Sequence, residues 1–558
     1  MIKTIKTIVR IHYICIILCL IFSCEKDFQK INIDPSIVDE INPDFLLTYS
    51  LNNLQQYRGT EWIWEDLEQT LRYSQLLTAN PYDFNRNAIN SRYRQYYEKI
   101  LPNLFEIRRI NLLRPDSGKF RNYNAITFIA QVYHGLKVSD VSGDIPYSEA
   151  MLGRIDGTLN PKYDSQESLY NSWLKELNDA IFQLSQNTTD QINPGAADIF
   201  YAGNWIYWIK LANSIKLRIA LRLELQRPEL TELIFQEVMN DSYGPILEAG
   251  SQFIYYNEDY DPIGNIIDYR SRRFANESMI DFMKVTKDPR INIYFKKNSL
   301  VGNWKEDFLQ NSVKLPKFID LEDSLVYFQG GPMDWSSGSD KVPYFIDGIN
   351  IGNNNYQLIS SINPIFFAPK MNGGTGIFKD ILYSDAEVYF IIAELLFKGY
   401  GDEIVGINDV EYWYEKGISA SIRNMIDIAN SAQMNLDSKI DIDAYKKNPF
   451  IQLGETDVLE KIYIQKWLNF FRSANEAFVL VRRTGFPYKD SNYIRWAHPG
   501  DEIYPRRFWT SDPGVVNATN WIESLQKQGF SIISYEKPIL NKERLWFDLA
   551  SPNFGERD

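Results

Sequence analysis

Residues 205–223 read WIYWIKLANSIKLRIALRL, and this stretch decides the fold class. Its apolar residues Trp205, Trp208, Ala212, Ile219 and Leu223 recur at spacings of three, four or seven, as they do on the buried face of an α-helix. The stretch contains no glycine and no proline. We therefore expect one long helix here.

The same period appears on both sides of this helix. Leu169, Trp173, Leu177, Ile181 and Leu184 predict a helix, and Val388 to Leu396 predicts another that closes on a C-terminal glycine. After a short polar loop, residues 410–428 are expected to form the antiparallel partner of the helix over 388–396. Such hairpins favour a mainly α fold of tetratricopeptide-like helix pairs, with long irregular loops and a few short strands.

Residues 460–482 also have helical period and are expected to form one long helix, which Gly485 and Pro487 end. Two other regions, about 243–381 and 487–558, lack a period. The first is rich in Gly, Asn, Pro and aromatic residues, as in residues 328–332, FQGGP. Long irregular segments in a folded protein are usually functional, so we expect them to be ligand loops.

The N-terminus predicts export. Lys3, Lys6 and Arg10 precede an apolar run, Ile11–Phe22, that is shorter than the roughly 20 residues of a membrane span but fits a secretory signal. The run ends in IFSC, which resembles the lipobox of bacterial lipoproteins with Cys24 as the lipidated residue. The expected organisation is a signal peptide over 1–23, a lipidated tether over 24–43 and one binding domain over 44–558.

The three cysteines are Cys15, Cys19 and Cys24, so a chain that is cleaved before Cys24 and acylated there keeps no free thiol. This excludes disulfides, a cysteine nucleophile and a cysteine zinc site in the body. The formal net charge of -13 disfavours nucleic acid and anionic membrane as partners, because both attract basic surfaces.

Motifs for catalysis are absent. Of the three histidines His12 belongs to the signal, and His134 and His498 alone cannot form a multi-histidine metal site. Asp140, Ser142 and Asp144 alternate like calcium ligands but do not fit the EF-hand template. We therefore expect no cofactor, no bound metal ion and no enzymatic activity. Glycoside hydrolysis by a carboxylate pair stays an alternative, because it needs no fixed spacing, and a helical-repeat assembly scaffold is another.

Five ordered blocks then match a known pattern. They are VSGDIPYSEA at 141–150, PKYDSQE at 161–167, WIKLANSIKLR at 208–218, the helix from Glu387 to Gly399, and QKW at 465–467 with RRTGFP at 482–487. On these blocks the chain resembles the SusD/RagB family of outer-membrane nutrient-binding lipoproteins, from Cys24 nearly to the end.

The resemblance implies a surface-exposed lipoprotein of the cell outer membrane. Such a protein has a mainly α, tetratricopeptide-like fold and caps a TonB-dependent barrel transporter. It captures oligosaccharide, or peptide in some branches, for that transporter and is not catalytic. Most residues of the shared blocks are expected to be buried scaffold: Trp208, Asn213 and Arg218 in one helix, and Glu476, Arg482 and Arg483 in another.

The ligand residues have to be sought elsewhere. A sugar ring stacks its apolar face on an aromatic ring and hydrogen-bonds through its hydroxyls, so loop aromatics beside polar residues are the candidates. An early loop and the irregular middle region supply them: Trp62, Trp64, Tyr82, Phe84, Arg86, Tyr327 and Trp335, with Tyr344 nearby. Trp62 and Trp64 could equally be helix residues that face the core.

Overall fold

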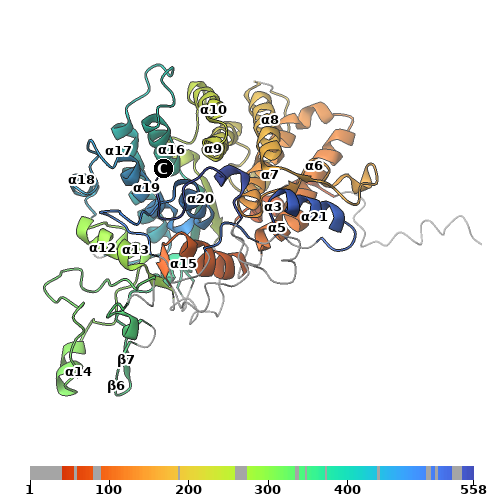
Figure 1. Cartoon of the computed structure of the whole chain (residues 1–558). Coiled ribbons are helices and arrows are strands. Elements are labelled where there is room, and N and C mark those ends of the chain that lie inside the picture. The colour runs from red at the N-terminus through yellow and green to blue at the C-terminus, as the bar shows by residue number, and fades with distance from the viewer. Residues whose placement is uncertain are drawn as a thin grey trace, which may run out of the picture.

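The computed structural model of the chain describes residues 41–55, 60–78, 90–186, 189–257, 273–333, 338–345, 348–370, 374–436, 440–497, 504–508, 510, 513–530 and 543–557. Helices make up most of them, which confirms the mainly α fold (Figure 1). None of the described helices is both long enough and apolar enough to cross a membrane.

The N-terminal part is a layer of helices that begins at the first described residues. Asn42 caps the first helix by accepting a hydrogen bond from Asp44 N at 2.9 Å, and Pro43 occupies its first position. The layer consists of α3 (Pro43–Asn52), the π-helix η1 (Thr60–Thr70), α4 (Leu71–Tyr73), α5 (Ser91–Gln95), the π-helix η3 (Tyr96–Ile100), α6 (Leu101–Leu113) and α7 (Arg121–Ser142).

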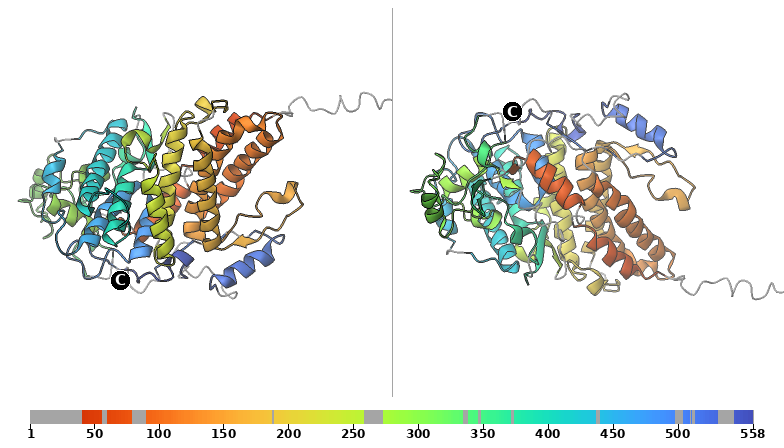
Figure 2. Two further views of the ribbon diagram at one scale, coloured as in Figure 1. Left: turned by 90° about the horizontal axis from the view of Figure 1, so that it is seen from above. Right: turned by 90° about the horizontal axis from the view of Figure 1, so that it is seen from below.

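Two helices predicted from the apolar period follow, α8 (Gln166–Ser185) and α9 (Trp205–Leu223). The next helix, α10 (Pro228–Asn240), was not predicted. The helix expected from residues 205–223 is confirmed with both bounds. Its start is fixed by Asn204, whose side chain accepts from Ile206 N at 3.1 Å. Figure 2 shows α7 to α10 side by side, as consecutive helices that pack pairwise.

The second predicted hairpin is also confirmed. It consists of α16 (Asp385–Phe397) and α17 (Val410–Ser431), which pack along their length. Ser384 caps α16 through a 3.1 Å bond from Glu387 N, and Gly399 beyond its end has a φ of 85°. A short helix, α18 (Ile442–Lys446), follows the hairpin.

The prediction of a single helix over 460–482 is wrong. The structure has α19 (Val458–Asn469), a 3₁₀ turn η10 (Phe470–Arg472) and α20 (Ala474–Thr484). The Phe471 ring stacks on Tyr294 with a centroid distance of 4.2 Å, and Arg472 pairs with Asp380 at 3.3 Å. Both partners are far away in sequence, so tertiary contacts accompany a break that the local period does not reveal. Gly485, with a φ of 70°, ends α20 as expected.

The strands are short and form four antiparallel pairs among the described residues. The pairs are β1 (Leu77–Thr78) with β5 (Phe274–Ala275), β2 (Ile145–Pro146) with β3 (Tyr163–Asp164), β4 (Phe253–Asn257) with β8 (Phe378–Tyr383), and β6 (Ile349–Ile351) with β7 (Asn354–Tyr356).

The two regions predicted as irregular contain more helix than expected. The middle region includes α12 (Glu277–Thr286), α13 (Ile291–Tyr294), α14 (Trp304–Gln310) and α15 (Pro364–Phe367), and the C-terminal region includes α21 (Ala518–Lys527). In Figure 1, α14 and the β6–β7 hairpin protrude from the body. They have a small hydrophobic cluster of their own, which includes Trp304, Phe308, Tyr356 and Leu358.

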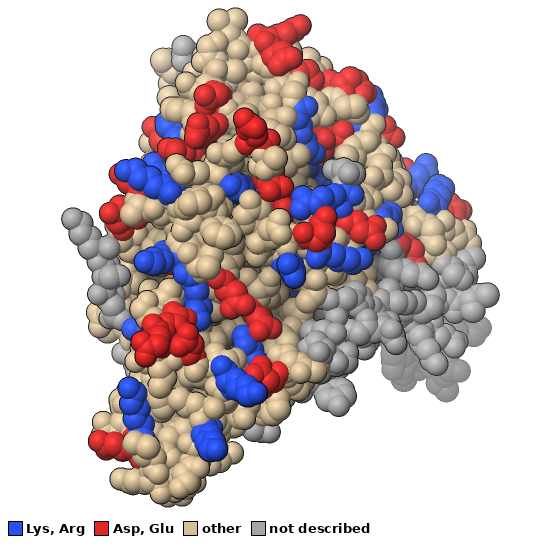
Figure 3. Space-filling model, turned by 60° about the vertical axis from the view of Figure 1, so that its left-hand side comes forward, with Lys and Arg blue, Asp and Glu red and all other residues tan. Residues whose placement is uncertain are grey.

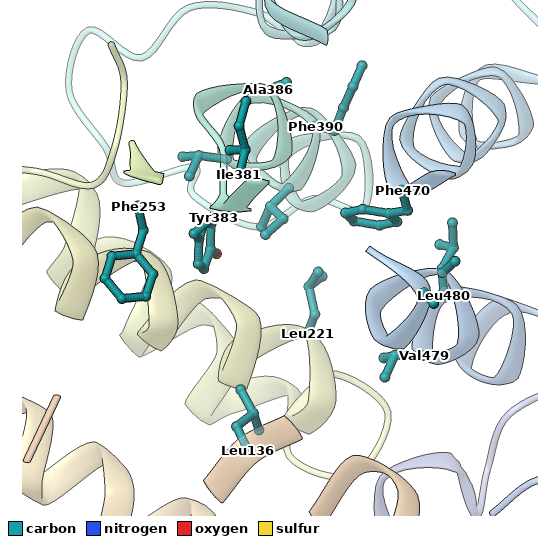
Figure 4. Packing of buried hydrophobic residues seen from close by; sticks show 14 of the residues in the cluster. Leu136, Leu221, Phe253, Ile381, Tyr383, Ala386, Phe390, Phe470, Val479 and Leu480 are labelled. Carbon is teal, nitrogen blue, oxygen red and sulfur yellow. The ribbon is translucent and has the colours of Figure 1, made fainter. Parts of the chain in front are cut away.

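The main core lies between the helical layers. In Figure 4, Leu136, Leu221, Phe253, Tyr383 and Phe390 come from α7, α9, β4, β8 and α16 and converge on one apolar interior. The elements that carry them are far apart in sequence. The core therefore joins the N-terminal helices to the α16–α20 region in one packed unit.

The residues predicted as scaffold are buried. Trp208 Nε1 donates to Asp198 Oδ2 at 2.7 Å, and Asn213 Nδ2 donates to the Gly244 carbonyl at 3.2 Å. Three of the others form charged pairs: Arg218 Nε with Glu387 at 2.7 Å, Glu476 with Arg222 Nη2 at 2.9 Å, and Arg483 with Glu394. Arg482 Nη1 donates to two backbone carbonyls, those of Asp140 in α7 and Arg506, each at 2.7 Å.

Candidate functional site

A turn after α4 is the point where several distant segments meet. Its Gln75 has a φ of 60° and a fully buried side chain that exchanges two hydrogen bonds with the backbone of Ala497, one of them from Ala497 N at 3.0 Å. The Gln75 carbonyl accepts from Asn276 Nδ2 at 2.9 Å. The preceding carbonyl, of Ser74, accepts from Trp467 Nε1 at 2.6 Å. One turn thus joins four parts of the chain.

Strand β1, which follows the turn, extends this meeting point. Strand β1 pairs with β5, and Thr78 Oγ1 donates to the Pro332 carbonyl at 2.9 Å. Gly331 in turn donates to the Ala275 carbonyl at 2.9 Å and accepts from Glu277 N at 2.9 Å.

The glycine pair of the FQGGP stretch is needed for this close approach. A Cβ atom on Gly330 would lie 2.3 Å from Glu277 Cα, and one on Gly331 would lie 1.9 Å from the Phe345 ring. We call Gln75, Thr78, Asn276, Gly331, Pro332 and Ala497 the loop junction.

At four points beside this junction the chain passes out of the described residues. The described residues at these points are Thr78, Arg273, Met333 and Ala497. Arg273 is buried and ion-paired with Glu68 of η1, which ties its segment to the same helix that leads into the Gln75 turn. The junction therefore brings a described flank of the first predicted loop region close to residues 331–332 of the middle one.

Four of the candidate ligand residues lie outside the described residues, Tyr82, Phe84, Arg86 and Trp335, as does the predicted lipidation residue Cys24. Thr78 lies shortly before Tyr82 in the sequence, and Pro332 lies shortly before Trp335. These two flanking residues are hydrogen-bonded to each other. The structure thus supports one common location for the flanks of these two segments.

The candidate ligand residues that the structure describes are buried or half-buried. Trp62 is 1% exposed and its ring packs 5.2 Å from Phe367, so the ligand role predicted for it does not fit its place in the core. Trp64 is half-buried against the same core. Tyr327 and Tyr344 are half-buried against the small cluster of the protruding lobe. These three keep part of their surface in solvent.

The junction residues themselves were not candidates in the sequence. Gln75, Thr78 and Asn276 are common polar residues, and their partners lie 201 to 422 positions away. The FQGGP stretch was the one visible signal, since two adjacent glycines often mark a close backbone approach.

A hollow of about 340 Å³ adjoins the junction, within the usual size range of small-ligand pockets. It is lined by Lys489, Trp496, Tyr504, Arg506, Asn553 and Phe554. The Trp496 and Phe554 rings stack on each other at 5.2 Å, so the lining combines aromatic rings with polar side chains. Tyr504 links the hollow to α4, the helix before the Gln75 turn, through a 2.8 Å hydrogen bond from its hydroxyl to the Arg72 carbonyl.

The closely spaced buried carboxylates at the centre of the molecule are structural. Glu387 and Glu476 both lie within 4 Å of Arg218, beside a cavity of only about 50 Å³. That volume holds a few waters and no sugar ring. Burial would raise the pKa of Glu476, but Arg218 and Arg222 outweigh it and lower that pKa to about 2. A permanently ionised, paired glutamate is no general acid.

His134 and Asp140 also have structural surroundings. Burial lowers the pKa of His134 to about 3, so the ring is neutral, and it stacks on Tyr96 at 5.7 Å. Asp140 pairs with Arg222 at 2.8 Å and accepts from Asn475 at 2.9 Å, which commits it to ion pairing. Among the described residues, no group of three or more His, Cys, Asp or Glu is placed to hold a metal ion.

The surface face in Figure 3 carries acidic and basic side chains intermixed. A nucleic-acid site would need a continuous basic patch. The charges on this face instead alternate in sign.

Comparison with known proteins identifies the class. The family model described as "Starch-binding associating with outer membrane" (SusD-like) matches residues 35–312 and 336–509, which is most of the chain. The chain belongs to the SusD/RagB family. The interruption at 313–335 includes Tyr327 and Trp335 in its sequence. No curated protein matches the chain.

Solved structures share the fold at low identity. A chitin-binding protein has a TM-score of 0.69 at 20% identity, covering 91% of this chain and 100% of its own. A chitin-binding SusD homologue from Flavobacterium johnsoniae has a TM-score of 0.65 at 20% identity, covering 92% and 100%. A SusD homologue from Bacteroides fragilis has 0.66 at 18% identity, covering 91% and 100%.

Proposed function

We propose that this protein is a surface lipoprotein of the outer membrane that binds an oligosaccharide and passes it, without chemical change, to a TonB-dependent barrel transporter. The observation that carries the binding role is the loop junction. It gathers the flanks of the two segments that contain the aromatic and polar candidates Tyr82, Phe84, Arg86 and Trp335. Membership of a family described as starch-binding supports the ligand class.

We place the ligand over the junction. Tyr82 and Trp335 are the proposed stacking residues, Phe84 and Arg86 assist, and Tyr327 and Trp64 lie at the margin. Aromatic rings offer sugars apolar contact area, while an arginine or amide beside them orients the hydroxyls. Peptide is the alternative ligand, because the same rings and cations also suit side chains and a terminal carboxylate.

Lipid attachment at Cys24 after removal of residues 1–23 would hold the body outside the cell. Residues 24–43 serve as the tether, and α3 begins at Pro43 where the body is proposed to start. Cys24→Ala should release the protein from the membrane fraction and abolish incorporation of labelled fatty acid. A variant that stays in the membrane fraction and still takes up the label would refute the anchor at this residue.

Two alternative functions predict different experimental results. A surface glycoside hydrolase predicts turnover of a labelled glycan by the purified protein. A helical-repeat scaffold predicts no small-ligand affinity at all. The central carboxylates give the hydrolase no support, because they are buried and ion-paired beside a cavity of about 50 Å³.

A calorimetric screen of glycans tests the proposal. Chito-oligosaccharides and malto-oligosaccharides are the first probes, since relatives are described as chitin- or starch-binding. Peptides of mixed sequence form a separate arm. Saturable binding of one glycan class, together with co-purification of a barrel protein from native membranes, is the expected result. If only peptides bind, the ligand is a peptide and not an oligosaccharide.

A further inference from the structure

One end of the helical body exposes several apolar side chains and includes a basic turn. It consists of the start of α3, the turn between α6 and α7, the end of α8 and residues 189–199, and we call it the tether end. Hydrogen bonds join these parts: Tyr123 OH to Asp44 Oδ1 at 2.8 Å, Ile192 N to the Lys119 carbonyl at 2.8 Å, Gln183 Nε2 to Asn122 Oδ1 at 3.0 Å, and Thr48 Oγ1 to the Ala197 carbonyl at 3.0 Å.

Large apolar side chains project from every part of the tether end. Phe45 of α3 is 76% exposed and Leu112 of α6 is 73% exposed. The other exposed members are Ile41, Leu113, Phe182 and Ile192. Single exposed apolar residues are ordinary, but a group on adjoining elements marks a contact surface.

One part of the tether end is basic, the turn beside Leu112 and Leu113, whereas Asp44 and Asp190 lie on its other parts. The turn from Arg114 to Arg121 carries three exposed cations, Arg114, Lys119 and Arg121, against one carboxylate, Asp116. The whole chain has a net charge of -13. Apolar residues beside a basic turn are the combination that anionic lipid headgroups attract, because the cations meet the phosphates while the apolar groups enter the interface.

The chain itself points to the occupant of this surface. Residue 41, the first described, lies at the tether end, and only 16 residues separate it from Cys24. A segment of that length reaches at most about 60 Å, so an acylated Cys24 keeps this end of the body close to the bilayer.

We propose that the tether end is a membrane-contact face, which rests on the bilayer surface and inserts Phe45, Leu112 and Leu113 among the lipid headgroups. This inference rests on the proposed lipid anchor. It adds a second membrane signal to the acyl chains, and it orients the body so that one end of the helices faces the lipid.

Depth measurements on single-cysteine proteins test the face. Beyond Cys24 the chain has no cysteine, so Leu112→Cys accepts one fluorescent label, and Val405→Cys provides a matched control. Val405 is 97% exposed and follows α16, whose end lies beside the end of α9 through the 2.9 Å pair of Lys398 and Glu224. α9 begins beside residues 198–204, so Val405 lies toward the opposite end of the helices.

The labelled proteins are purified from membranes and reconstituted through their own anchor into vesicles of phosphatidylethanolamine and phosphatidylglycerol that contain a lipid-borne quencher. Label at Leu112→Cys should be quenched at least about three-fold more than label at Val405→Cys. Lys119→Glu with Arg121→Glu should reduce that difference, because it reverses the local charge. Equal quenching at the two positions would overturn the proposal.

Two further outcomes are informative. If Leu112→Cys is shielded from lipid and aqueous quenchers alike, and only when the barrel partner is co-reconstituted, the face binds protein and the lipid proposal fails. Label that attaches to the unsubstituted protein would reveal a free Cys24 thiol. That result would refute the anchor on which the inference rests, and the titration of glycan in solution would still stand as a separate test of binding.

Discussion

The hydroxyl of Thr78 donates a 2.9 Å hydrogen bond to the carbonyl of Pro332, across 254 positions of sequence. This bond joins the residue that leads into the first predicted ligand loop to the segment that leads into the middle one. The two loops therefore share a support, and a change at the support is expected to alter ligand binding as well as stability.

Replacing the hydroxyl by a methyl group tests that support. Thr78→Val should cost about 1–2 kcal/mol of unfolding free energy, because the buried Pro332 carbonyl loses its donor. Glycan affinity should fall as well. Thr231→Val is the matched control, since Thr231 Oγ1 also donates to a buried carbonyl, that of Ala220 at 3.0 Å, between α9 and α10. An equal loss of affinity in both variants would show that the junction has no special role.

The close approach at Gly330 should tolerate no side chain. Gly330→Ala places a Cβ 2.3 Å from Glu277 Cα, so the backbone has to move, and we expect a loss of about 1–3 kcal/mol in urea denaturation. Gly454→Ala is the control, because no heavy atom lies within 4 Å of its added Cβ and its φ is not positive. A Gly330→Ala protein as stable as the Gly454→Ala protein would contradict the packing described here.

Much of the helical framework could be predicted from local sequence. The helices α8, α9, α16 and α17 have clear apolar periods, and side-chain caps such as Asn204 mark where they start. These signals act over a few residues, so they are visible without the fold. The scaffold role of Arg218 was likewise predictable, because a charged residue on a buried helix face needs a partner.

What the sequence could not reveal depends on distant partners. The break between α19 and α20 places Phe471 against Tyr294 and Arg472 against Asp380, and no local signal announces either contact. The burial of Trp62 depends in the same way on Phe367, 305 positions later. The Gln75 turn has ordinary residues, so its role as a meeting point follows only from the assembled fold.

The stacking role proposed for two loop residues has a direct test. Trp335→Ala and Tyr82→Ala should each weaken glycan binding by roughly ten-fold without changing the unfolding midpoint, because each removes contact area from a loop. Tyr412→Ala serves as control, since that tyrosine is exposed on α17. Unchanged affinity in either variant would remove that residue from the site.

The ion pairs of Glu394 predict a pH dependence of stability. Burial would raise the pKa of Glu394, but Arg483 and Lys466 outweigh it and lower that pKa to about 2. The folded-state pKa therefore lies below the unfolded-state value of 4.5, so this contribution is complete above about pH 4.5 and is lost as the pH falls toward 2.

Between about pH 5 and about pH 2.5, the unfolding free energy of the native protein should fall more steeply than that of Glu394→Gln, by up to about 3 kcal/mol. Chemical denaturation at several pH values measures this difference. Glu455→Gln removes an exposed carboxylate and should retain the native slope. Parallel slopes for the native protein and Glu394→Gln would count against the buried ion pair.

The central claim is that the protein binds an oligosaccharide and leaves it intact. The most direct measurement titrates the purified protein with the glycan class found in the screen and then analyses the recovered glycan by mass. Our account predicts a saturable binding isotherm and glycan of unchanged length after prolonged incubation. Shortened glycan, or no heat of binding with any glycan or peptide, would contradict it.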